Sequence, residues 1–401
     1  MKKTIALILT LCTLLLSAAP ALAVNDPDAG KLYFNADGSF RVLAISDFQD
    51  IDVCSPKSAD FLERILDYTQ PDLVVLCGDQ LSDSFTLATP LRIKTALSNI
   101  LEPINSRQIP FLFTFGNHDH DNNNILSSAR QAEIYKSFGY CFAESDGCDP
   151  GTYNKLVWSS DGSSPTLNIY MMDTNNTSKE AGGKWDGVHP EQVAWYKAKS
   201  DGLRQLNGGS AVPSVLFQHI PVKEIYQLLT VVPEGTPGAY TKPTAGLDSY
   251  YVLDPGRMTS AVWQMGEAPG SEILTRTTGQ YEAWLEKGDI IGAFFGHDHV
   301  NVFVGQTDDG ISLGYVGGFG FAAYGSGDER SATLLTFSEA DVENYTVENL
   351  RYCDLPGYEP GVPDDASGAA KLFGVISNGF SAMLRYIIET LLLPFRLFGL
   401  K

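Results

Sequence analysis

The sequence predicts an α/β fold, and three observations support this prediction. Short apolar runs alternate with longer segments of helical periodicity, an order that favours parallel strands covered by helices. The chain has 401 residues, of which 44% are hydrophobic, so it can fill a large core. Polar and charged side chains directly follow several apolar runs, as they do where functional residues gather at the carboxyl ends of strands in an α/β sheet.

The predicted elements follow in a regular order. The first part of the chain reads strand, helix, strand, helix, strand at 41–46, 59–68, 72–77, 91–105 and 110–115. Further short strands are predicted at 167–172, 214–218 and 290–295, with a helix over 190–199. We expect antiparallel hairpins through 311–316 and 332–337. Residues 222–279 are rich in Gly, Pro and Tyr without clear periodicity, which predicts an elaborated loop region.

The first 23 residues have the pattern of a secretory signal peptide. Lys2 and Lys3 precede an apolar run at 4–16, and Ala21-Leu22-Ala23 supplies the small residues read before cleavage. The run is shorter than the roughly 20 residues of a comfortable membrane span. We therefore expect an exported chain that begins near Val24 and is extracellular, at the cell surface or periplasmic.

Beyond residue 23 the chain divides into three predicted regions. A large domain over 24–354 is followed by a linker rich in Pro, Gly and Asp at 355–368 and by an amphipathic helix at 369–401. A bilayer crossing would bury Arg385 and Glu389 near its centre, at a cost of roughly 2.5–3.5 kcal/mol for a charged residue. We expect this helix to contact a membrane or a partner peripherally, and docking on the catalytic domain is the alternative.

The net charge limits the binding partners of the chain, and two cysteines raise the question of a disulfide. The formal net charge is −20, which argues against a nucleic-acid polymer as a partner, because phosphate backbones are bound by clustered Lys and Arg. A small phosphate-ester substrate remains compatible, since bound metal cations can set the local field. Cys141 and Cys148 flank a short turn, so export leaves open either a disulfide between them or two free thiols.

Five of the six histidines lie in three short stretches that each end a predicted strand. These stretches are Gly116-Asn117-His118-Asp119-His120, Gln218-His219-Ile220-Pro221 and Gly296-His297-Asp298-His299. Asp47 and Asp79 follow two further strands. Carboxylates together with imidazoles suit Mn, Zn or Fe, whereas an all-oxygen set would favour Mg or Ca. A carboxylate shared between two metals holds them roughly 3.5–4 Å apart, which suits displacement at phosphorus.

The ordered motifs of this chain resemble those of the calcineurin-like metallophosphoesterase superfamily, and within it the single-domain purple-acid-phosphatase-like branch. They are Asp47-x-Gln49, Gly78-Asp79, Gly116-Asn117-His118-Asp119, Phe217-Gln218-His219-Ile220-Pro221 and Gly296-His297-Asp298-His299. The resemblance covers roughly residues 40–350. It implies a four-layer α/β/β/α sandwich with two mixed sheets, and two divalent or di/trivalent metal ions.

The resemblance also implies a role for each motif residue. Asp47 and His299 would bind a first metal, Asn117, His219 and His297 a second, and Asp79 would bridge the two.

Two further side chains, His118 and Gln49, complete the predicted site. His118 follows the Asn ligand, where it would protonate the leaving oxygen or stabilise charge in the transition state. Gln49 stands where the superfamily usually has a histidine, so it would be a weaker neutral ligand. His120 lies just past the motif and is expected to be a solvated loop histidine.

We expect an exported two-metal phosphoesterase that hydrolyses phosphate mono- or diesters by attack of a metal-bridging water. A second hydrolase hypothesis is cleavage of a nucleotide or a phospholipid head group at the cell surface, with a differently shaped 222–279 region. The non-enzymatic alternative is a degenerate metal-binding module that lost one metal through Gln49 and does not turn over substrate.

Overall fold

The computed structural model describes residues 30–82, 85, 87–144, 147–178, 184–241, 247–269 and 278–361. The chain separates into two units, residues 1–31 and 32–401, and the fold below is that of the second unit. The predicted signal peptide, the C-terminal helix and the linker beyond Gly361 lie outside the described residues. Within the described ranges, no helix combines the length and the apolar character that a membrane crossing requires.

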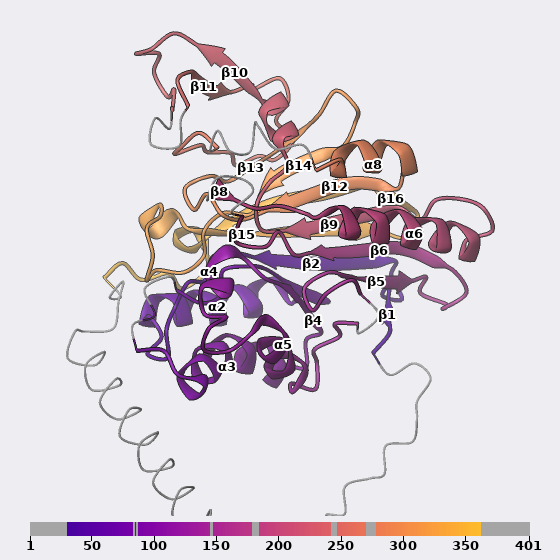
Figure 1. Ribbon diagram of the computed structural model, residues 1–401, viewed down its shortest axis with the longest axis horizontal. Coiled ribbons are helices and arrows are strands. Elements are labelled where there is room, and N and C mark those ends of the chain that lie inside the picture. Colours follow the sequence, from indigo (N-terminus) through magenta and orange to yellow (C-terminus); the bar gives the residue numbers. More distant parts are fainter. Residues whose placement is uncertain are drawn as a thin grey trace, which may run out of the picture. The chain divides into compact units, whose positions relative to one another are not determined.

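A five-stranded mixed sheet is built mainly from the first part of the chain (Figure 1). Its order is β16-β15-β2-β3-β4, with β16 at Asp341–Arg351, β15 at Ser331–Ser338, β2 at Ser39–Ile45, β3 at Leu73–Cys77 and β4 at Phe111–Thr114. The strands β2, β3 and β4 are mutually parallel. Strand β15 pairs antiparallel with β2, and β16 pairs antiparallel with β15. Every residue of β3 is buried, as expected for a central strand covered on both faces.

A seven-stranded mixed sheet carries the second half of the fold. Its order is β1 (Leu32–Tyr33), β5 (Tyr153–Trp158), β6 (Pro165–Met172), β9 (Ser214–Gln218), β12 (Ile290–Phe295), β14 (Ser312–Tyr315) and β13 (Phe303–Gln306). The run β6, β9, β12, β14 is parallel, and β13 pairs antiparallel with β14. The antiparallel pairing expected at 332–337 is confirmed, whereas the strand at 311–316 is antiparallel on one side only.

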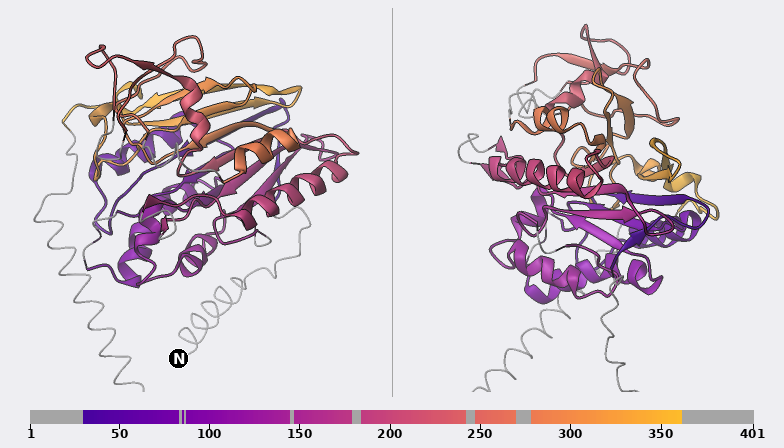
Figure 2. Two further views of the ribbon diagram at one scale, coloured as in Figure 1. Left: turned by 45° about the horizontal axis from the view of Figure 1, so that its top comes forward. Right: turned by 90° about the vertical axis from the view of Figure 1, so that its right-hand side faces the viewer.

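Helices cover the outer face of each sheet. They are α2 (Pro56–Thr69), α3 (Pro90–Ser106), α4 (Asn117–Asp121), α5 (Ser128–Lys136), α6 (Pro190–Leu206) and α8 (Gln280–Lys287). The helices α2, α3 and α5 share a hydrophobic cluster with the five-stranded sheet, and α6 and α8, which lie side by side in Figure 2, pack on the seven-stranded sheet.

The layer order follows from the alternation of side chains along β2. Leu43 and Ile45 pack into the cluster under α2 and α3, whereas Val42 and Ala44 pack into the cluster between the two sheets. The four-layer α/β/β/α sandwich with two mixed sheets is therefore confirmed. The local sequence also sets the helix starts, since Ser55 and Thr89 each cap a helix that begins with proline.

The structure departs from the sequence prediction in one region and decides one alternative that the sequence left open. Residues 222–279 are not only loop, because a 3-10 helix at Lys223–Leu228 leads into the hairpin of β10 (Leu229–Val232) and β11 (Tyr250–Leu253). Both strands of this hairpin are largely exposed or half-buried, so they lack the apolar run that predicts a strand. Cys141 and Cys148 are free thiols in the structure, the second of the two alternatives that the sequence left open.

Candidate metal centre

The predicted ligand residues are brought together from both sheets. Asp47 follows β2, Asp79 follows β3, Asn117 opens α4 after β4, His219 follows β9, and His297 and His299 follow β12. All six lie at carboxyl ends of strands, as expected for a site at the end of parallel strands. Five of them are at most 4% exposed, and His297 is half-buried. The centre thus lies on the seam between the sheets.

Ligand-type atoms from different strand ends lie in contact. The pairs are Asn117 Oδ1 with His297 Nδ1 at 3.0 Å, Asp47 Oδ1 with His299 Nε2 at 3.1 Å, and Asp79 Oδ2 with His219 Nε2 at 3.1 Å. Two ligand atoms about 2.1 Å from one metal and at right angles to each other are about 3 Å apart. Ligand atoms of Asp47, Asp79 and His219 also all lie within 4.8 Å of one another.

Two of the histidines are oriented by backbone carbonyls. His219 Nδ1 lies 3.1 Å from the carbonyl oxygen of Cys77, and His299 Nδ1 lies 2.8 Å from that of Tyr324. A carbonyl only accepts, so each Nδ1 carries a proton, and in the neutral imidazole the lone pair lies on Nε2. Nε2 of His219 is buried and faces Asp79 Oδ2 at 3.1 Å. This orientation is the usual one for metal-binding imidazoles, so the residues fit a metal centre.

The backbone at the centre is strained. Four of its residues adopt left-handed conformations, with φ of 55° at Asp47, 41° at Gln49, 52° at Asp79 and 78° at His297. Such conformations cost on the order of 1–3 kcal/mol each and cluster at functional sites. The strand ends also approach closely, because a Cβ at Gly116 would lie 2.2 Å from Asp79 Oδ1. Glycine at this position is therefore a steric requirement.

The buried charges of the centre perturb one another. Burial lowers the pKa of His219, but the carboxylates of Asp79 and Asp47 more than offset this and raise it to about 10. Burial and the charge of Asp79 together raise the pKa of Asp119 to about 7. Without metal, the carboxylates thus hold a proton on His219. Metal binding has to displace that proton, so metal affinity falls as the pH is lowered.

Gln49 contacts the predicted bridging residue. Its Nε2 donates to Asp79 Oδ2 at 2.9 Å, and the side chain is almost fully buried beside the centre. The amide nitrogen of Gln49 therefore faces the carboxylate of Asp79. The unprotonated nitrogen of a histidine could not donate this hydrogen bond. Gln49 as a metal ligand stays a prediction.

His118 lines a cavity of about 370 Å³ over the centre, and its imidazole is held by a carboxylate. Its Nδ1 lies 2.7 Å from Asp121 Oδ2, and Asn176 Nδ2 donates to Asp121 Oδ1 at 2.8 Å. Burial raises the pKa of Asp121, but the hydrogen bonds from His118 and Asn176 lower it below its usual value. Asp121 thus stays charged and can stabilise an imidazolium at His118.

Sequence reasoning missed Asp121 and Asn176. A signal for the first was present, because residues three apart on a helix face each other and Asp121 follows His118 by three. No comparable signal existed for Asn176, which lies 55 residues beyond Asp121.

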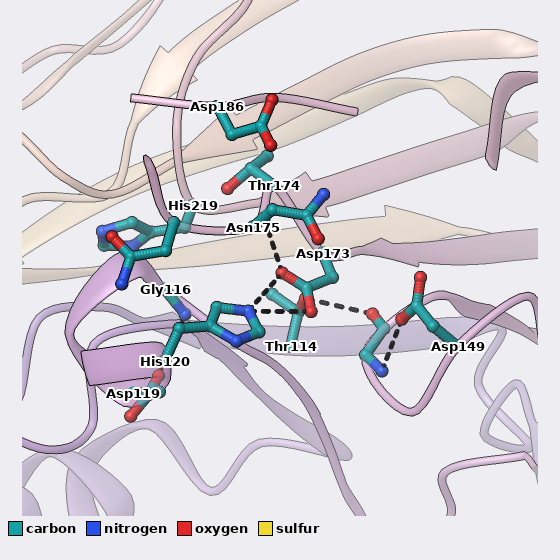
Figure 3. Close-up of polar contacts among 12 residues, drawn as sticks. Thr114, Gly116, Asp119, His120, Asp149, Asp173, Thr174, Asn175, Asp186 and His219 are labelled. Atoms are coloured by element: carbon teal, nitrogen blue, oxygen red, sulfur yellow. Dashed lines mark hydrogen bonds and ion pairs between the residues drawn. The ribbon is translucent and has the colours of Figure 1, made fainter. Parts of the chain in front are cut away.

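The expectation that His120 is a solvated loop residue is wrong. Its side chain is 9% exposed, and its Nε2 lies 2.9 Å from Asp173 Oδ1, a contact drawn in Figure 3. The ring also packs edge-on against Phe115, with centroids 5.6 Å apart. The physical reason is helical geometry, since two residues on a helix are about 200° apart. His118 therefore faces the cavity while His120 faces the end of β6.

The contact between His120 and Asp173 belongs to a wider polar network. Gln192 Nε2 donates to Asp149 Oδ2 at 3.0 Å and to the carbonyl oxygen of Asp173 at 2.8 Å. Burial and the charge of Asp173 raise the pKa of Asp149 to about 6. Figure 3 places Asp149 and His120 on opposite sides of Asp173. The network therefore ties α4, which carries Asn117 and His118, to the ends of β6 and α6.

Comparison with known proteins gives one family and several distant relatives. A family model described as calcineurin-like phosphoesterase matches residues 40–301, a range that contains every candidate ligand. A protein of Arabidopsis thaliana named "Probable inactive purple acid phosphatase 29" is 26% identical over 372 residues, which cover 82% of this chain and 83% of the relative. Another, "Probable inactive purple acid phosphatase 14", is 25% identical over 339 residues, 74% of each chain.

Among solved structures, one described as "GAP50 the anchor in the inner membrane complex of Plasmodium" aligns with a TM-score of 0.47 at 11% identity. The alignment covers 84% of this chain and 93% of that chain.

Proposed function

The chain belongs to the calcineurin-like phosphoesterase family, and we propose that it is an exported hydrolase of phosphate mono- or diesters that uses two metal ions. One observation carries the proposal: three pairs of ligand-type atoms, each about 3 Å apart, converge around Asp79 with His118 beside them. Export is supported by the signal-peptide pattern of residues 1–23.

The proposed metal ions would lie on either side of Asp79. Asp47 and His299 would hold one, and Asn117, His219 and His297 the other. Mixed carboxylate and imidazole ligands suit Mn, Zn or Fe. Bound ions would polarise the phosphoryl oxygens and lower the pKa of a bound water. The protein would hold the ligand atoms in place. Backbone carbonyls orient the imidazoles of His219 and His299, and the left-handed residues at the strand ends position the other ligands.

His118 is the proposed general acid. Its Nδ1 is engaged by Asp121, so the proton for the leaving oxygen is held on Nε2, which lies 3.9 Å from Asp79 Oδ2 beside the cavity. Asp121 stabilises the imidazolium before transfer, and Asn176 fixes the carboxylate. A positioned acid of this kind contributes typically about 10²–10⁴ to the rate.

A metal-binding module without turnover is the second candidate. Gln49 favours it, because an amide replaces the usual imidazole and its nitrogen is used by Asp79. Both Arabidopsis relatives also carry the word "inactive" in their names, which describes those proteins. We favour the hydrolase, because the contact between His118 and Asp121 provides a general acid, which a metal-binding module without turnover would not need.

One experiment separates these candidates. The full chain is stripped of metal, reloaded with Mn, Zn, Fe, Co or Mg, and assayed for metal content and for hydrolysis of a panel of phosphate mono- and diesters. The hydrolase proposal expects two metals per chain and turnover that disappears with chelator. Stable metal binding without turnover would establish the module instead. A second measurement tests export. Mass spectrometry of the protein from expressing cells should show cleavage near Val24, and an uncleaved chain found in the cytoplasm would contradict export.

A further inference from the structure

The cavity over the candidate centre has walls of two chemical kinds. The polar side chains that line it are Gln49, Asp79, His118, His297, Asp298 and His299, and the other lining residues are Trp185, Ala323 and Tyr324. A volume of about 370 Å³ lies within the range of small-molecule sites. The rings of Trp185 and Tyr324 are not among the proposed ligands, and both line the cavity.

Trp185 lies in β8 (Lys184–Trp185) and stands against two residues of the site. Its ring is edge-on to His297, with centroids 5.4 Å apart, and edge-on to His118 at 6.4 Å. The side chain is half-buried and belongs to none of the three hydrophobic clusters of the described structure. The indole therefore borders the cavity on the side of His297 rather than filling a core.

Tyr324 borders the same cavity on the side of His299. Its ring stacks on the imidazole of His299, with centroids 4.1 Å apart and planes 15° apart. Its hydroxyl donates to Glu267 Oε1 at 2.8 Å, which fixes the outer end of the ring. The side chain is nevertheless 55% exposed. One ring face is thus held by the protein and the other is available to a ligand, at little cost in conformational entropy.

We propose that this cavity selects phosphate esters whose alcohol part carries a planar aromatic ring, with Trp185 and Tyr324 holding the ring. The inference rests on the proposed hydrolysis and adds the substrate class to it. A phosphate bound at the candidate ligands would direct its ester group into the cavity that Trp185 and Tyr324 also line, since Trp185 contacts His297 and Tyr324 contacts His299. The ring could belong to a nucleobase or to a simple aryl group, since both stack on aromatic side chains.

The test compares esters that differ in the ring and share the chemistry of the leaving oxygen. Adenosine 5′-monophosphate and 2-phenylethyl phosphate carry a ring, n-propyl phosphate does not, and all three release an alkoxide. With the metal-loaded full chain, we expect kcat/KM for the ring esters to exceed that for n-propyl phosphate by roughly 10- to 100-fold. In Trp185→Leu and Tyr324→Leu this ratio should fall to within a few fold of one, whereas Trp263→Leu, an exposed aromatic residue that does not line the cavity, should keep it.

A binding readout separates this inference from the proposed function. Adenosine 5′-monophosphate should quench the tryptophan fluorescence of the full chain, and Trp185→Leu should remove the quenching although four other tryptophans remain. If no ester is hydrolysed, the proposed function fails, while quenching that depends on Trp185 still supports the ring site. Equal kcat/KM for all three esters, or quenching unchanged in Trp185→Leu, would overturn the ring site and leave hydrolysis intact. A ratio above one for the nucleotide alone would identify the ring as a base, and a ratio above one for both ring esters would identify any planar ring.

Discussion

The two sides of the candidate centre share one backbone design and differ in their ligands. On one side of Asp79 the chain offers Asn117, His219 and His297, and on the other it offers Asp47, His299 and the amide of Gln49. Both sides are made from strand ends with residues in left-handed conformations. The amide is a weaker ligand than an imidazole. If two metals bind as proposed, a single side chain would tune one metal position while the backbone architecture of both stays unchanged.

Removing the element that the two sides share should have the largest effect. Asp79→Asn is expected to abolish hydrolysis and to lower the content of both metals, because this buried carboxylate would bridge the two ions in the proposed site. Turnover, metal content and circular dichroism of the folded variant are the measurements. Asp161→Asn, which changes an exposed carboxylate in a turn, is the matched control. Two bound metals and unchanged turnover in Asp79→Asn would remove the shared-ligand assignment.

The next prediction separates acid chemistry from metal binding. His118→Ala should retain both metals and lose about 10²–10⁴ in kcat, because His118 contacts the centre without being a proposed ligand. Asp121→Asn should cost about 10- to 100-fold and change the pH profile of kcat, since it acts through His118. Metal loss in His118→Ala would make it a ligand and contradict the assigned role.

Replacing Gln49 by histidine should reduce the difference in metal affinity between the two sides. In the wild-type protein, chelator should remove the metals in two steps, the weaker one from the side of Asp47 and His299. Gln49→His should tighten that step by about 10- to 100-fold and bring the two steps together. Gln49→Leu is the matched variant without a polar group. Identical chelation curves for all three proteins would show that Gln49 contributes only its hydrogen bond to Asp79.

The smallest effect on turnover is expected at His120, which lies outside both sides but supports the helix that serves one of them. His120→Gln should lower the free energy of unfolding by about 1–3 kcal/mol, because it leaves Asp173 buried without its cationic partner. His118→Gln is the same substitution two residues away at a partly exposed position and should cost less.

The stability difference at His120 should depend on pH. Burial lowers the pKa of His120, but the charge of Asp173 more than offsets this and raises it above its ordinary value. The contribution of the pair is therefore complete below a pH of about 6.5, the unfolded pKa, and is lost as the pH rises through the raised folded pKa. Melting temperatures of the wild type and His120→Gln across this range check the sign. A difference that grows above neutral pH would contradict it.

The sequence predicted the part of the site that depends on strand ends. Short buried runs mark β2, β3, β4, β9 and β12, and the polar residues that follow them converge because parallel strands end at one edge. Contacts that cross the fold were not predictable. His120 meets Asp173 at a separation of 53 residues, and nothing near either residue indicates the other. The hairpin of β10 and β11 was missed because its strands are largely exposed and carry no buried apolar run.

The position of the centre on the seam between the sheets has a mechanical consequence. Asp47, Asp79 and Asn117 come from the five-stranded sheet, and His219, His297 and His299 from the seven-stranded sheet. An ion held by both groups would be a cross-link between two layers that otherwise meet through apolar contacts and bonds such as that from His219 to the Cys77 carbonyl. Neither layer could hold it alone, so ion binding would be coupled to the docking of the two sheets. Chelation should therefore raise amide exchange at the ends of β3 and β9 together.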